Sequence, residues 1–256
     1  MSDRFEGRAV LVTGGSTGLG YGAAAQFAAE GATVFIASRR QEQIDTAAAQ
    51  ITELINQHRS GGTTVAVACD ITVQADLDRL FAVVTERTGH LDAVVANAGA
   101  PAFQSLGDYT HGELDRTFGL NFKGTILTVQ GALPLMSAGR SIVLMSSIEG
   151  ERGSAGLGIY AATKAALQSF ARTWANELAE RWIRVNAISP GVIFTPAYAQ
   201  GGVTLESLDA VISLIPAGRL GTYEDIARAI AFLPCDDSAF VNGTNLVVDG
   251  GQTEVV

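Results

Sequence analysis

A tyrosine and a lysine that could exchange a proton with a substrate stand four residues apart, in Tyr160-Ala-Ala-Thr-Lys164. Residues at this spacing share one face of a helix, so the phenol and the ammonium are expected to be neighbours. A phenol has a pKa of about 10 and is a poor acid–base group at neutral pH, but a nearby positive charge stabilises its phenolate. The pair therefore favours general acid–base chemistry, and the alternative is a chance pairing on a structural helix.

Ser147 is the third member of this candidate site. It precedes Tyr160 by 13 residues and follows the apolar run Arg140–Ser146, which has the composition of a buried strand. Open α/β proteins bind ligands at the carboxyl ends of their parallel strands. The combination of serine, tyrosine and lysine therefore predicts a catalytic site at such an edge.

A glycine-rich turn, Thr13-Gly-Gly-Ser-Thr-Gly-Leu-Gly20, follows the first apolar run and leads into an alanine-rich helical segment. Gly14, Gly18 and Gly20 allow a tight turn and a close approach of the backbone to a diphosphate, while the helix N-terminus supplies free N–H groups. Glycines also end strands for purely conformational reasons. The position of this turn between a strand and a helix favours a dinucleotide cradle.

Short apolar runs alternate with longer segments of helical periodicity along the whole chain. This alternation is typical of α/β proteins, so we expect one domain over residues 1–256, with a doubly wound Rossmann-type parallel sheet of about seven strands and helices on both faces. Expected strands are Arg8–Thr13, Ala32–Ser38, Thr64–Ala68, Leu91–Ala96, Arg140–Ser146, Arg184–Ser189 and Asn245–Asp249. Expected helices are Gly18–Glu30, Gln41–His58, Val73–Thr88, Gly112–Met136, Tyr160–Arg181 and Thr222–Leu233.

The composition restricts what the protein binds. Twenty-six acidic and 17 basic residues among 256 give a net charge of -9, which disfavours nucleic acid as a partner. Cys69 and Cys235 are too few for a disulfide framework. His58, His90 and His111 lack metal-ligand spacing, so we expect them at the surface and expect no metal. No apolar run reaches the roughly 18 residues of a membrane span and no signal peptide is apparent, so we expect a soluble cytoplasmic protein without a membrane partner.

The order of the motifs resembles that of the classical short-chain dehydrogenase/reductase family. The resemblance runs from about residue 5 to residue 252, and its glycine spacing is wider than that of the general dinucleotide fingerprint. The residues that carry it are the Thr-Gly-x-x-x-Gly-x-Gly turn, Cys69-Asp70, Asn97-Ala98-Gly99, Asn121, Ser147, Tyr160 with Lys164, and Pro190-Gly191. Family members often have asparagine where Ala96 stands, a departure that leaves the Asn-Ala-Gly core intact.

This resemblance implies a role for each catalytic residue. Tyr160 would exchange the proton with the substrate oxygen, and Ser147 would hold that oxygen by a hydrogen bond. Lys164 would lower the pKa of the tyrosine and bind the nicotinamide ribose. Asn121 would interrupt its helix and hold a water that links Lys164 to solvent, the alternative being a side chain bonded to backbone. Ser146 competes for the role of the serine, and the 13-residue spacing favours Ser147.

The resemblance also implies the cofactor contacts. Asp70 would contact the adenine amine, Asn97-Ala98-Gly99 would border the cofactor, and Pro190, Gly191 and Thr195 would contact the carboxamide side of nicotinamide. The complete set expected to bind the cofactor is Gly14, Ser16, Thr17, Gly18, Leu19, Gly20, Ser38, Arg39, Arg40, Asp70, Ile71, Asn97, Ala98, Gly99, Tyr160, Lys164, Pro190, Gly191, Ile193 and Thr195.

The end of the second strand, Ser38-Arg39-Arg40, predicts NADP(H) rather than NAD(H). NAD-binding proteins of this architecture carry an acidic residue there for the ribose hydroxyls, whereas a 2′-phosphate needs a cation. Arg39 could stack on adenine and pair with the phosphate, and Ser38 could donate a further hydrogen bond. The alternative is a pair of solvated surface arginines.

We therefore expect an NADP(H)-dependent alcohol dehydrogenase or carbonyl reductase that interconverts a hydrophobic ketone and a secondary alcohol, similar to bacterial ketoreductases. Acyl-carrier ketoreductases, sugar dehydrogenases and steroid dehydrogenases share this chemistry and stay open, as do a non-catalytic dinucleotide sensor and a sugar-nucleotide epimerase. The resemblance also suggests a homotetramer packed through Gly112–Met136 and Tyr160–Arg181.

Two features near the candidate site have open interpretations. The long connection over residues 190–221 carries a stripe of apolar residues that predicts a short amphipathic helix, either peripheral core or a substrate lid. The stripe consists of Leu205, Leu208, Val211, Ile212 and Ile215. Glu149, close after Ser147, could recognise a polar or cationic group or could lie in a solvated loop with Glu151 and Arg152.

Overall fold

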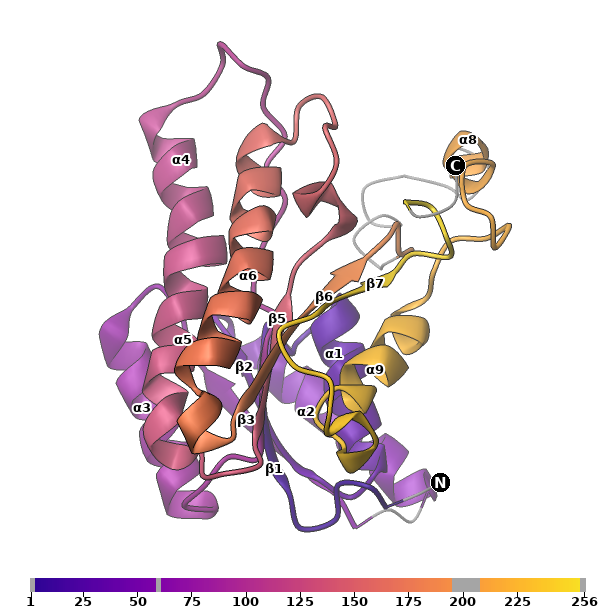
Figure 1. The fold of residues 1–256 in the computed structure, drawn as a ribbon. Coiled ribbons are helices and arrows are strands. Elements are labelled where there is room, and N and C mark those ends of the chain that lie inside the picture. The colour runs from indigo at the N-terminus through magenta and orange to yellow at the C-terminus, as the bar shows by residue number, and fades with distance from the viewer. Residues whose placement is uncertain (1–2, 59–60, 195–207, 254–256) are drawn as a thin grey trace.

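The computed structural model describes residues 3–58, 61–194 and 208–253. Its centre is a parallel seven-stranded sheet with the strand order β3-β2-β1-β4-β5-β6-β7, shown in Figure 1. The strands are β1 (Ala9–Thr13), β2 (Thr33–Ser38), β3 (Thr63–Ala68), β4 (Ala93–Ala96), β5 (Ser141–Met145), β6 (Arg184–Pro190) and β7 (Asn245–Val248). The order reverses between β1 and β4, so their carboxyl ends form the topological switch point where this architecture binds ligands. The predicted α/β class is confirmed, and each expected strand lies within two residues of its observed bounds.

Both faces of the sheet are buried, which explains why the strands are apolar throughout rather than alternating. In β1, Val10 and Val12 face a core cluster that includes Phe27 and Ile226. Leu11 faces the opposite cluster. Removal of apolar surface from water stabilises the folded state by about 25 cal/mol for each Å². The burial of these two clusters is therefore the main favourable contribution to folding.

The helices divide between the two faces (Figure 1). The first cluster packs under α1 (Gly18–Ala29), α2 (Gln41–His58) and α9 (Tyr223–Phe232). The second packs under α3 (Gln74–Arg87), α5 (Thr125–Ala132) and α6 (Gly158–Glu177). Such two-sided coverage is what makes a doubly wound sheet stable as one unit.

The expected helix Gly112–Met136 is one helical stretch, but it is not uniform. It consists of α4 (His111–Phe118), a π-helical segment η1 (Gly119–Gly124), α5 and a short 3₁₀ turn over Leu133–Leu135. A π-turn inserts an extra residue into the helix and is often found at functional sites. Asn121 lies in the middle of this segment and is 1% exposed.

The long connection after β6 contains α8 (Asp209–Ile212). Leu208 and Ile215, two residues of the predicted apolar stripe, are buried against Leu220 in a small separate cluster. This part of the stripe is therefore peripheral core. Leu205 and Thr195 lie outside the described residues.

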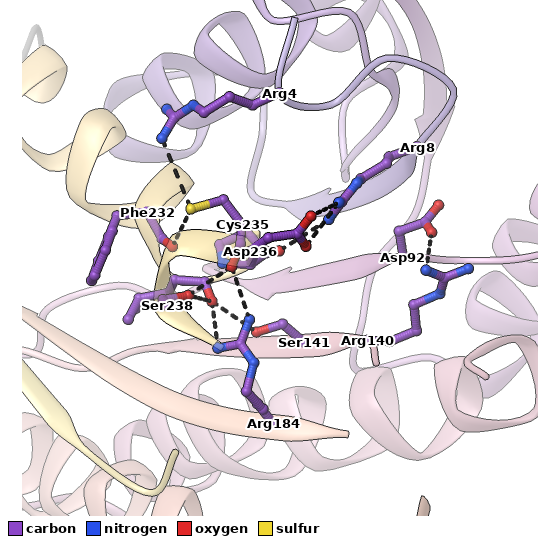
Figure 2. A network of polar contacts seen from close by, with 12 residues as sticks. Arg4, Arg8, Asp92, Arg140, Ser141, Arg184, Phe232, Cys235, Asp236 and Ser238 are labelled. Atoms are coloured by element: carbon purple, nitrogen blue, oxygen red, sulfur yellow. Dashed lines mark hydrogen bonds and ion pairs between the residues drawn. The ribbon is translucent and has the colours of Figure 1, made fainter. Parts of the chain in front are cut away.

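At the amino edge of the sheet, far from the switch point, a polar network fastens the chain between α9 and β7 (Figure 2). The Arg184 guanidinium donates to the carbonyl oxygens of Leu233, Val241 and Cys235 at 2.7, 3.1 and 3.3 Å. Arg8 pairs with Asp236 at 2.9 Å. The same loop carbonyls also accept from the side chains of Ser238, Ser141 and Asn186, so charged and neutral donors together satisfy them.

In the ranges that the structure describes, no helix is both long enough and apolar enough to cross a lipid bilayer.

Candidate active site

The turn between β1 and α1 needs its glycines for two different reasons. Gly14 and Gly18 have φ values of +67° and +56°, the left-handed region that favours glycine. Gly20 has no room for a side chain, because a Cβ there would lie 2.3 Å from the Gly14 carbonyl oxygen and 2.5 Å from Asn97 Nδ2. Gly15 is restricted in the same way by Ile36, at 2.9 Å. The backbone of the turn is therefore bare and closely packed on the sheet.

The N-terminus of α1 has donors to offer a ligand. Its cap residue, Thr17, makes no side-chain hydrogen bond to the first turn, and that turn carries no acidic residue. The first N–H groups of a helix need acceptors, and together with the positive end of the helix dipole they favour an anion. The turn with Ser16 and Leu19 thus fits the diphosphate of a dinucleotide.

Asn97 fixes this turn from the neighbouring strand. Its Nδ2 donates to the carbonyl oxygens of Thr13 and Gly14 at 2.8 and 3.3 Å. In return, the backbone N–H groups of Asn97 and Ala98 both donate to Thr13 Oγ1 at 3.1 Å. Sequence reasoning counted Asn97 only as a residue bordering the cofactor and gave Thr13 no role beyond the motif. The structure joins the ends of β1 and β4 through this pair.

The ends of β2 and β3 carry the residues expected at the adenosine side. Ser38 pairs with Ala68 in the ladder, and Arg39 and Arg40 are exposed. Within the described part of the chain, neither guanidinium has a hydrogen-bond or ion-pair partner. Two positive charges therefore stand free at the carboxyl end of β2, as a phosphate site requires.

Asp70 and Ile71 follow β3 with different environments. One carboxylate oxygen of Asp70 accepts from the Thr72 N–H and hydroxyl at 2.9 and 2.7 Å, which fixes the turn after the strand. Ile71 is 4% exposed, and a Cβ on Gly124 would lie 2.8 Å from its side chain. Ile71 thus packs against the end of the π-helical segment, and only its backbone is left to face a ligand.

Tyr160 and Lys164 lie on one face of α6, as their spacing predicts. Lys164 Nζ is 5.5 Å from the centroid of the Tyr160 ring and donates to the Met145 carbonyl oxygen at the end of β5, at 2.7 Å. The lysine is 4% exposed, and its burial lowers the pKa of its ammonium to about 8. A Cβ on Gly99 would lie 3.4 Å from Nζ, so the lysine borders the Asn97–Gly99 segment that holds the glycine turn.

The two adjacent serines have different environments. Ser146 is 3% exposed, and its Oγ donates to the Lys164 carbonyl oxygen at 2.9 Å. Ser147 caps the short 3₁₀ turn η3 (Ile148–Gly150), and its Oγ accepts from the Glu149 N–H at 3.2 Å. A hydroxyl that accepts in this way keeps its own proton to donate. Ser147 therefore has a hydrogen-bond donor to offer a ligand, whereas Ser146 is committed to the helix backbone.

Asn121 uses its amide on the neighbouring loop. Its Oδ1 accepts from the Ala100 N–H and its Nδ2 donates to the Ala100 carbonyl oxygen, both at 2.9 Å. Nδ2 also lies 3.3 Å from Thr163 Oγ1. The expected interruption of the helix takes the form of the π-turn, and the alternative of a side chain bonded to backbone describes these contacts. The water that would link Lys164 to solvent stays a prediction.

The segment after β6 lies against the start of the C-terminal tail. The Gly191 N–H donates to the Val248 carbonyl oxygen at 3.0 Å, and a Cβ on Gly191 would lie 2.6 Å from Asp249 Cβ. Pro190 is the last residue of β6, and the side chain of Ile193 is buried in the core. This backbone therefore ends at the same sheet edge as the glycine turn, and Thr195 lies outside the described residues.

Sequence reasoning missed Gln168, one helical turn after Lys164. Its side chain is 6% exposed, and its Nε2 donates to Ser189 Oγ at 3.2 Å and to the Ser147 carbonyl oxygen at 3.4 Å. Glu151 is exposed, but its Oε1 accepts from Asn245 Nδ2 at 2.6 Å, so it is not simply solvated. Glu149 Oε2 is buried without a partner in the described structure, and its role stays open. For Gln168, the sequence signal was its spacing of four residues from Lys164, which predicts that the two side chains share one face of the helix.

The structure describes two of the three histidine side chains. His111 is exposed at the start of α4, and His90 Nε2 lies 3.1 Å from Asp92 at the amino end of β4, half exposed rather than fully at the surface. The His58 side chain lies outside what the structure describes. Across the described ranges, no group of three or more His, Cys, Asp or Glu side chains could hold a metal ion.

A bare glycine turn at a helix N-terminus, next to a tyrosine–lysine pair at the switch point of a parallel sheet, defines a dinucleotide-binding oxidoreductase of the α/β class. A family model described as enoyl-(acyl carrier protein) reductase matches residues 14–253. The chain belongs to the classical short-chain dehydrogenase/reductase family, whose members use a nicotinamide dinucleotide.

Three similar proteins cover almost all of the chain. An oxidoreductase of Sarocladium schorii, asL5, is 41% identical over 98% of both chains. A hydroxynaphthalene reductase-like protein of Metarhizium majus, Arp2, is 34% identical over 96% of this chain and 95% of its own. A solved short-chain dehydrogenase of Burkholderia cenocepacia in complex with NADP is 32% identical, with a TM-score of 0.86 over 97% of this chain and 99% of its own.

Proposed function

We propose that the protein is an NADP(H)-dependent alcohol dehydrogenase or carbonyl reductase, which interconverts a ketone and a secondary alcohol with Tyr160 as general acid and base. The observation that carries the proposal is the position of the buried Lys164 ammonium, 5.5 Å from the Tyr160 ring, on the helix beside Ser147. When bound, the nicotinamide ring supplies or accepts the hydride.

Side chains of the protein transfer the proton and position the substrate. Tyr160 donates its proton to the carbonyl oxygen during reduction, and Lys164 stabilises the phenolate that forms, because an adjacent positive charge favours that form. Ser147 donates a hydrogen bond to the same oxygen, and its acceptor bond from the Glu149 N–H supports this direction of donation. Lys164 would also bind the nicotinamide ribose, and Asn121 would hold a water beside it.

The free charges on Arg39 and Arg40 support a preference for NADP(H) over NAD(H). Both guanidinium groups are exposed at the end of β2, and the position before them is Ser38 rather than an acidic residue. The 2′-phosphate of NADP is the chemical difference between the two cofactors that such charges recognise. The related protein from Burkholderia cenocepacia is described in complex with NADP.

A hydrophobic ring ketone is the substrate class that we propose. Phe103 and Leu106, in the connection after β4, are 75% and 90% exposed. This connection lies close to Tyr160, since the Gln104 N–H donates to the Gly156 carbonyl oxygen at 2.8 Å. The name of the Metarhizium relative refers to a hydroxynaphthalene, which is an aromatic ring compound.

We also propose a homotetramer that packs through the α4–α5 stretch and α6. A row of aromatic side chains supports this, with Phe122 stacked on Phe170 at 5.4 Å, Phe170 stacked on Trp174 at 4.4 Å, and Phe118 exposed at the end of α4. The molar mass of the purified protein in solution would show whether it assembles.

The experiment that tests the activity follows reduced-cofactor absorbance with NADPH and a panel of aryl ketones, cyclic ketones, a steroid ketone, a keto sugar and an acyl thioester. We expect turnover of the ring ketones. Turnover restricted to the sugar or to the thioester would replace the proposed substrate class. Cofactor binding without turnover of any compound would favour a non-catalytic dinucleotide sensor.

Tyr160→Phe tests the mechanism. We expect kcat to fall at least about a hundredfold, because general acid–base catalysis contributes roughly 10²–10⁴. Affinity for NADPH and the melting temperature should change little. Tyr223→Phe removes a phenol from α9 and is the matched control. A rate close to that of the wild type in Tyr160→Phe would remove this residue from the mechanism.

A further inference from the structure

A chain of four polar side chains connects the backbone of Ser147 to the last strand of the sheet. Gln168 Nε2 donates both to the Ser147 carbonyl oxygen at 3.4 Å and to Ser189 Oγ at 3.2 Å. Ser189 Oγ lies 2.8 Å from Asn245 Oδ1, and Asn245 Nδ2 donates to Glu151 Oε1 at 2.6 Å. We call these four residues, Gln168, Ser189, Asn245 and Glu151, the amide relay.

The hydrogen bonds of the amide relay run in one direction. Gln168 uses the two hydrogens of its amide on two different acceptors, so the Ser189 hydroxyl accepts from Gln168 and donates to Asn245. The Asn245 amide then has its Nδ2 free to donate to Glu151. A flipped Gln168 amide would place its carbonyl oxygen against the Ser147 carbonyl, so the relay fixes one orientation of this side chain.

The amide relay holds both ends of one short segment. Ser147 and Glu151 flank the 3₁₀ turn η3, and the relay bonds the carbonyl of the first and the carboxylate of the second. Inside the segment, the Ser147 carbonyl also accepts from the Gly150 N–H at 3.0 Å. A Cβ on Gly150 would lie 2.7 Å from Gln168 Nε2, so the glycine leaves space for the glutamine.

Burial of the Gln168 amide would lower stability if this side chain only filled space. The side chain is 6% exposed, and burial of an amide lowers stability unless its hydrogen bonds are met. An apolar side chain of the same length would fill the volume without that penalty. A buried amide that bonds the backbone of a catalytic serine is more useful as a means of setting the position of that serine.

We propose that Gln168 is a positioning residue that sets the orientation of Ser147 through its carbonyl and couples it, through Ser189, to Pro190 and Gly191 at the expected nicotinamide segment. This inference rests on the proposed function, since it assigns Ser147 to the substrate oxygen. Ser189 immediately precedes Pro190 at the end of β6, so the relay places the substrate-holding serine and the cofactor-binding backbone in one rigid frame.

The first test is a double-mutant cycle between Gln168→Met and Ser147→Ala, with Gln130→Met as control because Gln130 is exposed on α5. Methionine keeps the length of glutamine and removes both donors. We expect Gln168→Met to lower kcat about tenfold, with little change in the KM for NADPH or in the pH profile. In the Ser147→Ala background, the same substitution should have no further effect, because residues that act as a unit are not additive. An equal loss in both backgrounds, or a shifted pH profile, would overturn the proposal.

The second test does not depend on turnover. Hydrogen exchange of the Glu149, Gly150 and Glu151 amides reports on the 147–151 segment in the wild type and in Gln168→Met. We expect at least tenfold faster exchange at these amides in Gln168→Met and no change in Gln130→Met. Unchanged exchange would overturn the positioning claim. If the wild type turned over no ketone, the proposed function would fail, while the exchange measurement would still decide whether Gln168 positions the segment.

Discussion

Lys164 carries a charge in the proposed mechanism, yet its side chain is buried. Its ammonium donates to the Met145 carbonyl oxygen, and burial lowers its pKa to about 8. The ammonium form still dominates at neutral pH, so it can stabilise a phenolate on Tyr160. The same burial opposes folding, which is a common relation between stability and activity at catalytic sites.

Comparison of Lys164→Met with the wild type tests this cost. The folded-state pKa of about 8 lies below the ordinary value of 10.5. From pH 8 to pH 10.5 the unfolded chain binds this proton and the folded chain does not, so the contribution of this group to stability rises with pH over that window. The unfolding free energy of the wild type relative to Lys164→Met should therefore increase by about 1–3 kcal/mol between neutral and strongly basic pH.

Denaturant unfolding of both proteins at several pH values measures this difference, because other titrating groups contribute to both and cancel. The variant should have no measurable turnover at any pH. A stability difference that stays constant with pH would mean that the buried lysine is protonated equally in both states.

Arg39→Asp tests the choice of cofactor. An aspartate at the end of β2 repels a 2′-phosphate and accepts hydrogen bonds from the ribose hydroxyls of NAD. We expect the KM for NADPH to rise at least tenfold while that for NADH changes little or falls. Arg172→Asp, which makes the same change at an exposed position of α6, is the control. An unchanged ratio would show that Arg39 is a solvated surface residue.

The helices and strands position these residues. Some of these elements could be predicted from the sequence, and some details of them could not. The strands could be predicted to within two residues, because continuous β-branched runs buried on both faces have few other solutions. The glycine turn and the Tyr160 motif could also be placed, because each lies between a predicted strand and a predicted helix. The interruption of the helix at Asn121 was expected from the family resemblance alone, and no local residue pattern indicated that it would take the form of a π-turn. The burial of Gln168 could not be predicted either, since nothing in the local sequence distinguishes a buried amide from an exposed one.

Gly20→Ala tests the fit of α1 on the sheet. The added methyl would collide with the Gly14 carbonyl and the Asn97 amide, both of which shape the turn. Overpacking of this kind costs about 1–3 kcal/mol. We expect a lower melting temperature and at least tenfold weaker NADPH binding, measured by fluorescence titration. Gly112→Ala is the matched control, since a Cβ there meets nothing within 4 Å. Equal cofactor affinity in both variants would contradict the close packing of the turn.

The whole molecule separates its tasks between the two edges of one sheet. The carboxyl edge carries the glycine turn, Ser147 and Tyr160, and the amino edge carries the network of Figure 2, in which Arg184 bonds three backbone carbonyls. Burial lowers the pKa of Arg184, but its guanidinium remains charged at any physiological pH. We therefore expect substitutions in the network at the amino edge to change stability without changing catalysis.

Arg184→Leu tests this separation. Loss of the guanidinium removes its charged hydrogen bonds to the carbonyls of Leu233, Cys235 and Val241, which keep only neutral donors such as Ser238 and Asn186. This loss should lower the unfolding free energy by about 1–3 kcal/mol. The kcat of the folded fraction should stay within about twofold of the wild type, because the network lies at the opposite edge. Arg172→Leu should change neither quantity. A large fall in kcat with unchanged stability would connect the two edges.

The chain contains two lysines, Lys123 and Lys164, and they differ in access. Lys123 is exposed on the π-helical segment, while Lys164 is enclosed at the end of β5. Reagents that label primary amines will therefore reach Lys123 while the chain is folded, and will reach Lys164 only after the chain opens. Coupling through amines should consequently attach the protein to a solid support without chemical modification of Lys164, to which we assign a role in proton transfer.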